Sequence, residues 1–131
     1  MVIDTSALLA VFLDEPERER FLDLIIEAET RLISAANALE TGIVLEARRG
    51  EAAGREFDLF IVRAGVQLVP VDGEQVDVAR SAWRKFGKGR HPAALNFGDC
   101  FAYALAKASD QPLLAKGTDF ALTDIEVCSG V

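Results

Sequence analysis

The sequence predicts an α/β fold in which helices cover both faces of a mainly parallel sheet of four or five strands. Short apolar runs alternate along the chain with longer stretches whose apolar residues recur every three or four positions. The short runs are apolar at every position, which is typical of strands that are buried on both faces. The chain has 131 residues, enough for one domain with a substantial core, so we assign residues 1–131 to a single domain.

The expected strands are short and lie between the helices. The first is the run MVI at residues 1–3, which ends at Asp4. The third contains Pro70, and because proline cannot donate a hydrogen bond to a neighbouring strand, the end of this strand should lie at an edge or outside the sheet. In chain order, the expected strands cover residues 1–3, 31–33, 66–71, 112–115 and, as a fifth, 125–127.

The expected helices are marked by residues that cap their first turns. Thr5 or Ser6 is expected to cap the first helix, and Ser34 is expected to cap the helix at residues 35–49. Asn96 and Asp99 have the spacing of a capping box, so they should open the last helix with an acid fixed in its first turn. In chain order, the expected helices cover residues 7–13, 17–29, 35–49, 51–64, 73–86 and 95–108.

Composition limits the classes of protein to which the chain could belong. The formal net charge of −7 argues against a protein that grips nucleic acid through its overall charge, although a local basic patch could still do so. Cys100 and Cys128 belong to no paired motif and are expected to be free thiols, as in a reducing cytoplasm. The apolar N-terminus is interrupted by Asp4 and Asp14, so we expect neither a signal peptide nor a membrane span.

Four acids are expected to meet at the edge of the sheet where the strands end. Asp4 follows the first strand, Asp119 follows the fourth, and Asp99 opens the helix that leads into the fourth. Glu40 interrupts an apolar helix face, where an unpaired charge would be costly unless it faced a cleft. Each acid alone is explained by capping or by surface exposure. Four together would repel one another unless a cation lay between them, and oxygen ligands suit Mg²⁺ or Mn²⁺.

A basic run lies just ahead of Asp99. Residues 84–91 read RKFGKGRH, and we expect Lys88 and Arg90 to contact the phosphates of a substrate. The alternative is a solvated helix end whose cations complement the helix dipole. Lys116, near Asp119, is expected to be either a phosphate contact or a partner in a salt bridge.

Four blocks of the sequence, together covering much of the chain, carry a family resemblance. In chain order they read MVIDTSALLAVFLDEPE, SAANALETGIVLEARRG, GKGRHPAALNFGDCFAYALAKA and PLLAKGTDFALTDI. In these blocks the chain resembles PIN-domain ribonucleases, and more narrowly the VapC-type toxins of bacterial type II toxin–antitoxin pairs.

The resemblance implies a PIN-like three-layer α/β/α sandwich and a Mg²⁺-dependent endoribonuclease, with Mn²⁺ as a substitute. Asp4, Glu40 and Asp99 match the three core acids of the family, and Asp119 matches its more variable fourth acid. Asp4 and Asp99 would hold the metal directly, and Glu40 and Asp119 would complete the site. The metal would activate a water that attacks the phosphodiester, leaving a 5′-phosphate and a 3′-hydroxyl. The departure at Thr118, where relatives often carry an acid or an amide, leaves open the roles of Asp119 and Asp124.

Two further expectations concern Thr5, Ser6 and the partners of the chain. Thr5 or Ser6 would fix a carboxylate or a water near the substrate, cap the first helix, or do both. The first two helices offer Phe12, Phe21 and Leu22 beyond the needs of one core face, which suggests a partner surface. The resemblance implies a homodimer and a cognate antitoxin that covers the acidic cleft, besides the RNA substrate.

Two other classes of protein stay in view. One is a catalytically weak or inert PIN-like module that only binds RNA or a partner. The other is a different α/β enzyme that acts on phosphate through acids. A phosphatase of that kind would carry a second acid at position 6, where this chain has Ser6, and a response-regulator receiver would carry an adjacent acid pair near its first strand.

Overall fold

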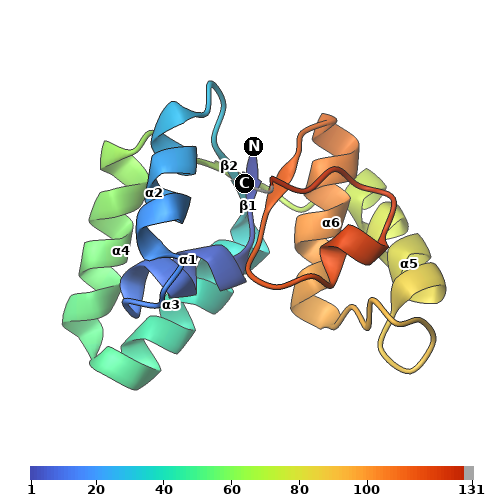
Figure 1. The fold of residues 1–131 in the computed structure, drawn as a ribbon, viewed down its shortest axis with the longest axis horizontal. Helices are drawn as coiled ribbons and strands as arrows, with labels where there is room; N and C mark the ends of the chain where they lie inside the picture. Colours follow the sequence, from blue (N-terminus) through green and yellow to red (C-terminus); the bar gives the residue numbers. More distant parts are fainter. Residues whose placement is uncertain (129–131) are drawn as a thin grey trace.

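A parallel sheet of four short strands lies between two layers of helices in this protein (Figure 1). The structure is a computed structural model, and it describes residues 1–128. The strands are β1 (Val2–Ile3), β2 (Leu32–Ser34), β3 (Gln67–Val69) and β4 (Leu113–Leu114), arranged in the order β3-β2-β1-β4. All neighbouring pairs are parallel. The predicted three-layer α/β/α architecture is therefore confirmed.

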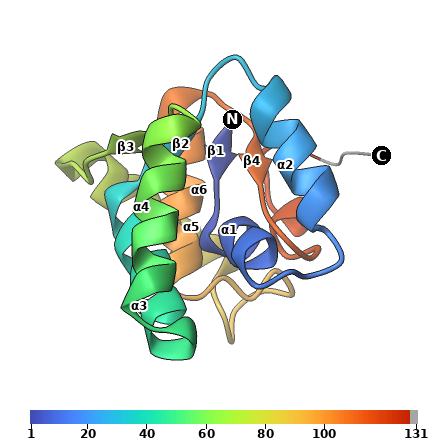
Figure 2. The same cartoon turned by 90° about the vertical axis from the view of Figure 1, so that its left-hand side faces the viewer.

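Helices α1 to α4 cover one face of the sheet, and α5 and α6 cover the other (Figures 1 and 2). The limits predicted for α3 and α5 agree with the structure. Among residues 1–128, no helix is both long and apolar enough to cross a membrane. The helices are α1 (Thr5–Phe12), α2 (Arg18–Glu27), α3 (Ala35–Arg49), α4 (Glu51–Arg63), α5 (Gly73–Phe86) and α6 (Phe97–Ser109), with a short 3₁₀ helix η1 (Phe120–Leu122).

β1, β2 and β4 are buried strands that each contribute to two cores, whereas β3 is largely exposed. Successive side chains of a strand point to opposite faces of the sheet. Ile3 and Ile33 therefore pack against α1 to α4, whereas Val2 and Leu32 pack against α5 and α6. This alternation explains why the sequence shows continuous apolar runs and no apolar–polar alternation in β1 and β2.

The two ends of the sheet differ in how well the sequence predicted them. β3 is an edge strand, as Pro70 indicated. The expected fifth strand at residues 125–127 was wrong within the described residues, because only Val127 forms an isolated bridge, to Leu113. Up to residue 128, the backbone there contacts β4 only at Leu113, whose N–H donates to the carbonyl of Glu126 and whose carbonyl accepts the N–H of Cys128.

Two predicted helix caps were wrong in their side-chain details. Asp4, and not Thr5 or Ser6, is the N-cap of α1, and its carboxylate accepts a hydrogen bond from the backbone N–H of Ser6. Ser34 stands at the N-cap of α3, but its buried hydroxyl has no hydrogen-bond partner among residues 1–128. The cysteines agree with expectation, since Cys100 and Cys128 are both free thiols.

The side chains of the partner surface predicted on α1 and α2 pack into the core instead, although Phe12 and Leu22 stay partly exposed. Phe21 is only 1% exposed, and the ring of Phe12 packs edge-on against those of Phe57 and Phe60. Leu22 packs against the same core. Phe21 is covered, and Phe12 and Leu22 are partly covered, because α3 and α4 add further apolar surface on this face of the sheet. The exposed large apolar residues lie elsewhere, at Ile26, Leu39, Ile43, Leu59, Val62, Leu68, Val76, Trp83, Phe97 and Leu122.

We expect Phe21→Ala to lower the free energy of unfolding by about 3–5 kcal/mol, because it leaves a cavity in the core between α2 and the sheet. Ile26→Ala on the same helix is the matched control. Ile26 is 67% exposed, so its loss should cost less than about 1 kcal/mol. Urea unfolding followed by circular dichroism measures both. Equal losses in the two variants would contradict the packing described here.

Candidate active site

The candidate site lies where β1 and β4 end, at the point where the strand order reverses. The chain adds β2 and β3 on one side of β1 and then returns to place β4 on the other side. In open parallel sheets, the segments that leave neighbouring strands at such a point diverge and form a crevice. Asp4 directly follows β1, and Asp119 lies in the segment that follows β4.

Asp4 is a buried carboxylate, with 4% of its surface exposed. Its Oδ2 accepts hydrogen bonds from the backbone N–H of Ser6 (3.0 Å) and from the Ser6 hydroxyl (2.6 Å). The pKa of Asp4 is raised to about 6, mainly by burial and in smaller part by the charges of Asp99 and Glu40, while the two bonds from Ser6 oppose the shift. The site therefore holds a charge that the fold only partly compensates.

Glu40 projects from α3 toward the same region. Its Oε1 accepts a hydrogen bond from the Thr5 hydroxyl (2.6 Å) and a longer one from Nδ2 of Asn37 (3.3 Å). Nδ2 of Asn37 also donates to the backbone carbonyl of Gly98 (3.1 Å), which joins α3 to the first turn of α6. Sequence reasoning missed Asn37. The signal was present, because Asn37 precedes Glu40 by three residues and so lies on the same helix face.

Gly98 makes room for Glu40. A Cβ atom at this position would lie 2.6 Å from Oε2 of Glu40, which is closer than any ordinary contact. The small residue beside Asp99 therefore allows α3 and α6 to approach at the site.

Asp99 occupies the first turn of α6 in the capping box that the sequence predicted. Its Oδ2 accepts the backbone N–H of Asn96, and its own N–H donates to Oδ1 of Asn96, both at 2.9 Å. Burial is the main cause that raises the pKa of Asp99, and the charges of Asp119 and Glu40 add to it. Asp99 thus lies close enough to the other acids to share their electrostatic field.

The structure distinguishes Asp119 from Asp124. Asp119 is exposed, and its charge acts on Asp99. Asp124 instead accepts a hydrogen bond from the Tyr103 hydroxyl (2.5 Å) and pairs with Nζ of Lys107 (3.0 Å), which fastens the segment after η1 to α6. Of the two acids, only Asp119 faces the acidic cluster of Asp4, Glu40 and Asp99.

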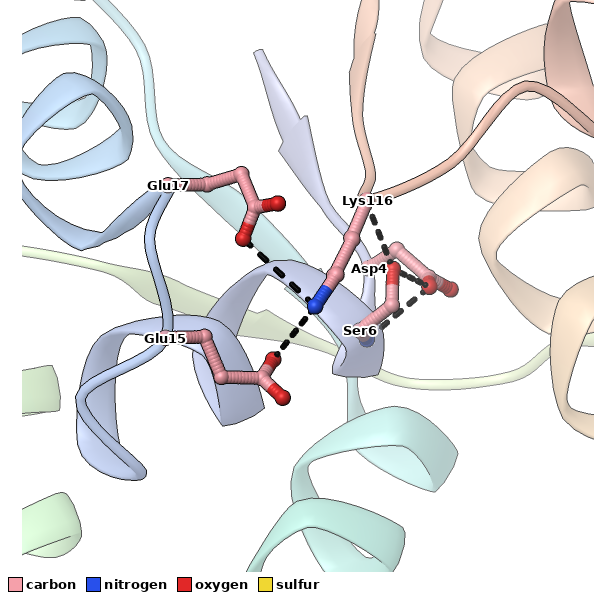
Figure 3. Close-up of polar contacts among 5 residues, drawn as sticks. All are labelled: Asp4, Ser6, Glu15, Glu17 and Lys116. Carbon is pink, nitrogen blue, oxygen red and sulfur yellow. Dashed lines mark hydrogen bonds and ion pairs between the residues drawn. The ribbon is translucent and has the colours of Figure 1, made fainter.

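Lys116 forms salt bridges in this structure (Figure 3). Its Nζ lies 3.2 Å from Oε1 of Glu15 and 3.5 Å from Oε2 of Glu17, so the side chain points toward the turn between α1 and α2. Its backbone N–H donates to the Ser6 hydroxyl (2.9 Å), which in turn donates to Asp4. The chain after β4 is therefore connected to Asp4 through one hydroxyl. The phosphate contact that was the alternative for Lys116 stays a prediction.

The hydroxyls of Thr5 and Ser6 both hold carboxylates, which is one of the roles expected for them. Thr5 donates to Glu40 and Ser6 to Asp4. Their contact with a substrate is untested and stays a prediction. Lys88 and Arg90 are exposed in the segment between α5 and α6, which leads directly to Asn96, and their contact with phosphates also stays a prediction.

The donor set of this site suits a hard divalent cation in its chemistry. Each of Asp4, Glu40 and Asp99 uses one carboxylate oxygen for protein donors and leaves the other without a hydrogen bond from residues 1–128. All the atoms that could bind a metal here are carboxylate oxygens, the ligand type that Mg²⁺ and Mn²⁺ prefer. Within the described part of the chain, however, no three His, Cys, Asp or Glu side chains are arranged as a group that could hold an ion as they stand. A cation would have to draw these carboxylates together.

Comparison with known proteins gives consistent matches over nearly the whole chain. Residues 1–126 match the family model of the PIN domain. Ribonuclease VapC30 of Mycobacterium tuberculosis is 58% identical over 125 residues, covering 95% of each protein. Ribonuclease VapC of Mycolicibacterium smegmatis is 57% identical, covering 95% of this chain and 97% of the relative.

Solved structures with low sequence identity share the fold. The Mycobacterium tuberculosis VapC20, described as a sarcin-ricin loop cleaving toxin, superimposes with a TM-score of 0.76 at 17% identity and 95% coverage of both chains. A chain of a toxin–antitoxin complex from Klebsiella pneumoniae gives a TM-score of 0.73 at 16% identity, covering 99% of this chain and 97% of the other.

We expect Asp4→Asn to stabilise the protein without metal at about pH 7.5. In the folded state the pKa of Asp4 is about 6, above its ordinary value of 3.8, so folded protein binds this proton more tightly and loses stability as the pH rises between these values. The full shift corresponds to a penalty on the order of 3 kcal/mol. The variant should therefore melt several degrees higher in EDTA, and the gain should vanish near pH 4.

Asp124→Asn is the control with the opposite sign. Burial alone would raise the pKa of Asp124, but its hydrogen bonds to Tyr103 and Lys107 leave that pKa below its ordinary value. Its charge therefore stabilises the fold at neutral pH, and its removal should lower the melting temperature. If Asp4→Asn also melted lower at pH 7.5, Asp4 would not carry an uncompensated charge.

Proposed function

The chain belongs to the PIN-domain family, among the VapC ribonucleases, and we propose from this membership and from its site that it is a metal-dependent endoribonuclease, the toxin of a toxin–antitoxin pair. One observation carries the proposal. Three segments that are far apart in the sequence bring Asp4, Glu40 and Asp99 together, since Thr5 beside Asp4 donates to Glu40 and Asn37 donates to Gly98 beside Asp99, in a chain 58% identical to a ribonuclease.

The proposed cofactor is Mg²⁺, with Mn²⁺ as a substitute. Asp4 and Asp99 would hold the cation, and Glu40 and Asp119 would complete its surroundings. Such a cation supplies positive charge that stabilises the phosphate under attack and makes a nearby water more acidic. The need for it is supported by the raised pKa values of Asp4 and Asp99, which burial raises most and the neighbouring acids raise further, because a cation would stabilise the charged form of both groups.

The residues of the chain would orient the reacting groups. Ser6 holds one oxygen of Asp4, Thr5 and Asn37 hold one oxygen of Glu40, and the capping box holds one oxygen of Asp99. This restricts each carboxylate while its second oxygen stays available. In the proposed reaction a water oxygen adds to phosphorus, the bond to the 3′ oxygen breaks, and the products are a 5′-phosphate and a 3′-hydroxyl.

The RNA would be held by local cations because the chain as a whole repels it. With a formal net charge of −7, the protein attracts a phosphate backbone only where cations are grouped. We assign this contact to Lys88 and Arg90, in the segment that leads to Asn96 and Asp99. Lys116 could join them only after leaving Glu15 and Glu17.

We also propose a cognate antitoxin and a homodimer. Structural neighbours of the fold come from complexes of toxin with antitoxin, which supports the first. Leu39 and Ile43 on α3 and Phe97 on α6 are more than half exposed and border the acidic site, so partner chains would remove considerable apolar surface from water. The free thiols support a reducing, cytoplasmic location.

Cleavage of structured RNA in the presence of Mg²⁺ tests the activity. We expect wild-type protein to cleave, EDTA to abolish cleavage, and Asp99→Asn to slow it by more than about 100-fold, because the variant loses a charge from the site. Asn at this position can still accept the N–H of Asn96, so the capping box is retained. Asp110→Asn is the matched control, since Asp110 is exposed at the other end of α6 in a left-handed conformation that asparagine adopts readily.

Three results would decide against the proposal. Cleavage that persists in EDTA would exclude the metal, and cleavage unaffected by Asp99→Asn would exclude the site. RNA binding without any cleavage would favour the inert module. Asp110→Asn should cleave as the wild type does.

Thermal melting tests the metal without reference to activity. A cation that binds only the folded state stabilises it by about 2.7 kcal/mol at a hundred times its dissociation constant. We expect Mg²⁺ or Mn²⁺ to raise the melting temperature of the wild type and of Asp110→Asn by several degrees. Asp99→Asn should gain much less. An equal gain in all three proteins would place the cation elsewhere.

A further inference from the structure

A groove between α5 and α6 has no ligand assigned to it so far, although Lys88, which lines it, is a proposed phosphate contact. These two helices lie side by side on one face of the sheet (Figure 1). The groove has a volume of about 660 Å³, within the usual range for small-ligand pockets. Its walls combine aromatic side chains with cations, and they include Trp83, Phe97, Phe101, Arg80, Lys88 and Asn96.

Trp83 is held in position as a flat surface. It is the only tryptophan of the chain, and 46% of its side chain is exposed. A Cβ atom on Gly87 would lie 2.7 Å from Cδ1 of the indole, so the ring packs directly on the glycine backbone. The guanidinium carbon of Arg90 lies over the ring, 4.2 Å from its centroid. Arg90 therefore occupies one face of an indole that Gly87 holds in place, and a base in the groove would stack on the other face.

Phe97 and Phe101 connect the groove to the acidic site. Phe97 is the first residue of α6 and is 80% exposed, and its ring packs edge-on against that of Phe101 at 4.8 Å. Both rings also line a second, smaller cavity, of about 310 Å³, which contains Glu40 and Gly98. Asn96, the cap that holds Asp99, lines the groove as well. A ligand in the groove would therefore lie beside the carboxylates.

The charges around the groove indicate the class of ligand. The chain has a formal net charge of −7, yet the groove is bordered by Arg80 and Lys88, and Arg90 covers its indole. Proteins bind single-stranded nucleic acid by stacking bases on aromatic rings while cations contact the neighbouring phosphates. A purely apolar partner would explain the rings but not the cations.

We propose that the groove between α5 and α6 binds an unpaired nucleobase of the RNA substrate. The base stacks on Trp83 and Phe97, and Lys88 and Arg80 contact its flanking phosphates. This inference rests on the proposed ribonuclease function and adds a determinant of which RNA is cut. It places an unstacked nucleotide next to the carboxylates, so loops and single strands are preferred over regular duplexes.

The single tryptophan makes the test direct. The probes are a single-stranded RNA hexanucleotide and the same hexanucleotide with one internal abasic site, which keeps its phosphates, both in EDTA so that nothing is cleaved. We expect the intact RNA to quench the emission of Trp83. The abasic site is placed at each internal position in turn. At the position that occupies the groove, it should abolish most of this quenching and weaken binding by about tenfold.

Variants separate stacking from charge, with affinities measured by the anisotropy of end-labelled RNA. Trp83→Leu and Phe97→Leu should each lower the affinity for intact RNA toward that for the abasic probe. Lys88→Gln should weaken binding of both probes equally and reduce the dependence on salt by about one phosphate contact. Ile26→Ala, an exposed apolar residue on α2, is the control and should bind as the wild type does.

Several outcomes would overturn the proposal. One is an unchanged base preference in both Trp83→Leu and Phe97→Leu when thermal melting shows that these variants are folded. Another is that RNA fails to quench the emission of the wild type while Trp83→Leu changes the molar mass of the assembly in sedimentation. The groove would then join two copies of the chain. Cleavage by the wild type without base-dependent binding would reject the groove alone. Base-dependent binding without cleavage would reject the ribonuclease function alone.

Discussion

The carboxylate of Asp4 sets the main physical constraint on this structure. It is buried at the end of a central strand, beside two further acids, and nothing in its immediate contacts is a cation. The fold tolerates this charge by surrounding the acids with hydrogen-bond donors from Ser6, Thr5, Asn37 and Asn96. Asp4 and Asp99 also lie at the N-termini of α1 and α6, where the helix dipoles favour negative charge. These contributions reduce the repulsion without removing it, which is the condition under which a cation binds most favourably.

The same constraint explains contacts that join the layers of the fold. Asn37 donates to Gly98 across the space between α3 and α6, and the absence of a side chain at Gly98 lets Glu40 approach. On the other side of β1, Lys116 ties the segment after β4 to the turn between α1 and α2 while its backbone supports Ser6 (Figure 3). A helix from each side of the sheet and the segments after two strands therefore meet at the acids. Substitutions at Asn37, Gly98 or Lys116 would therefore alter the site, although none of these residues is one of the four acids.

The sequence predicted the fold well because its signals are local. Helical spacing located α3 and α5, and the spacing of Asn96 and Asp99 predicted the capping box of α6. It predicted less about contacts between distant segments. Asp4 and Ser6 compete for the same cap, and only the packed structure shows that the carboxylate accepts the bond. The direction of Lys116 depends on Glu15 and Glu17, which are a hundred residues away in sequence, and Asn37 acquires its role only when Gly98 approaches. Phe12 and Phe21 were misjudged because the apolar surface supplied by α3 and α4 is not visible in the pattern of α1 and α2.

A strongly acidic ribonuclease has to solve a problem that its acids create. The carboxylates repel the phosphate that is to be cleaved, and a net charge of −7 adds a long-range repulsion that a few surface cations offset only at close range. Stacking of a base on an aromatic ring is not opposed by this charge and does not weaken as salt screens the cations. An indole fixed on Gly87, with the rings of Phe97 and Phe101 between it and Glu40, supplies that interaction where electrostatic attraction is weakest. If both proposals hold, the groove between α5 and α6 and the acidic site have complementary tasks: the groove would hold the RNA through a base, and the acidic site, with a bound cation, would act on the neighbouring phosphate.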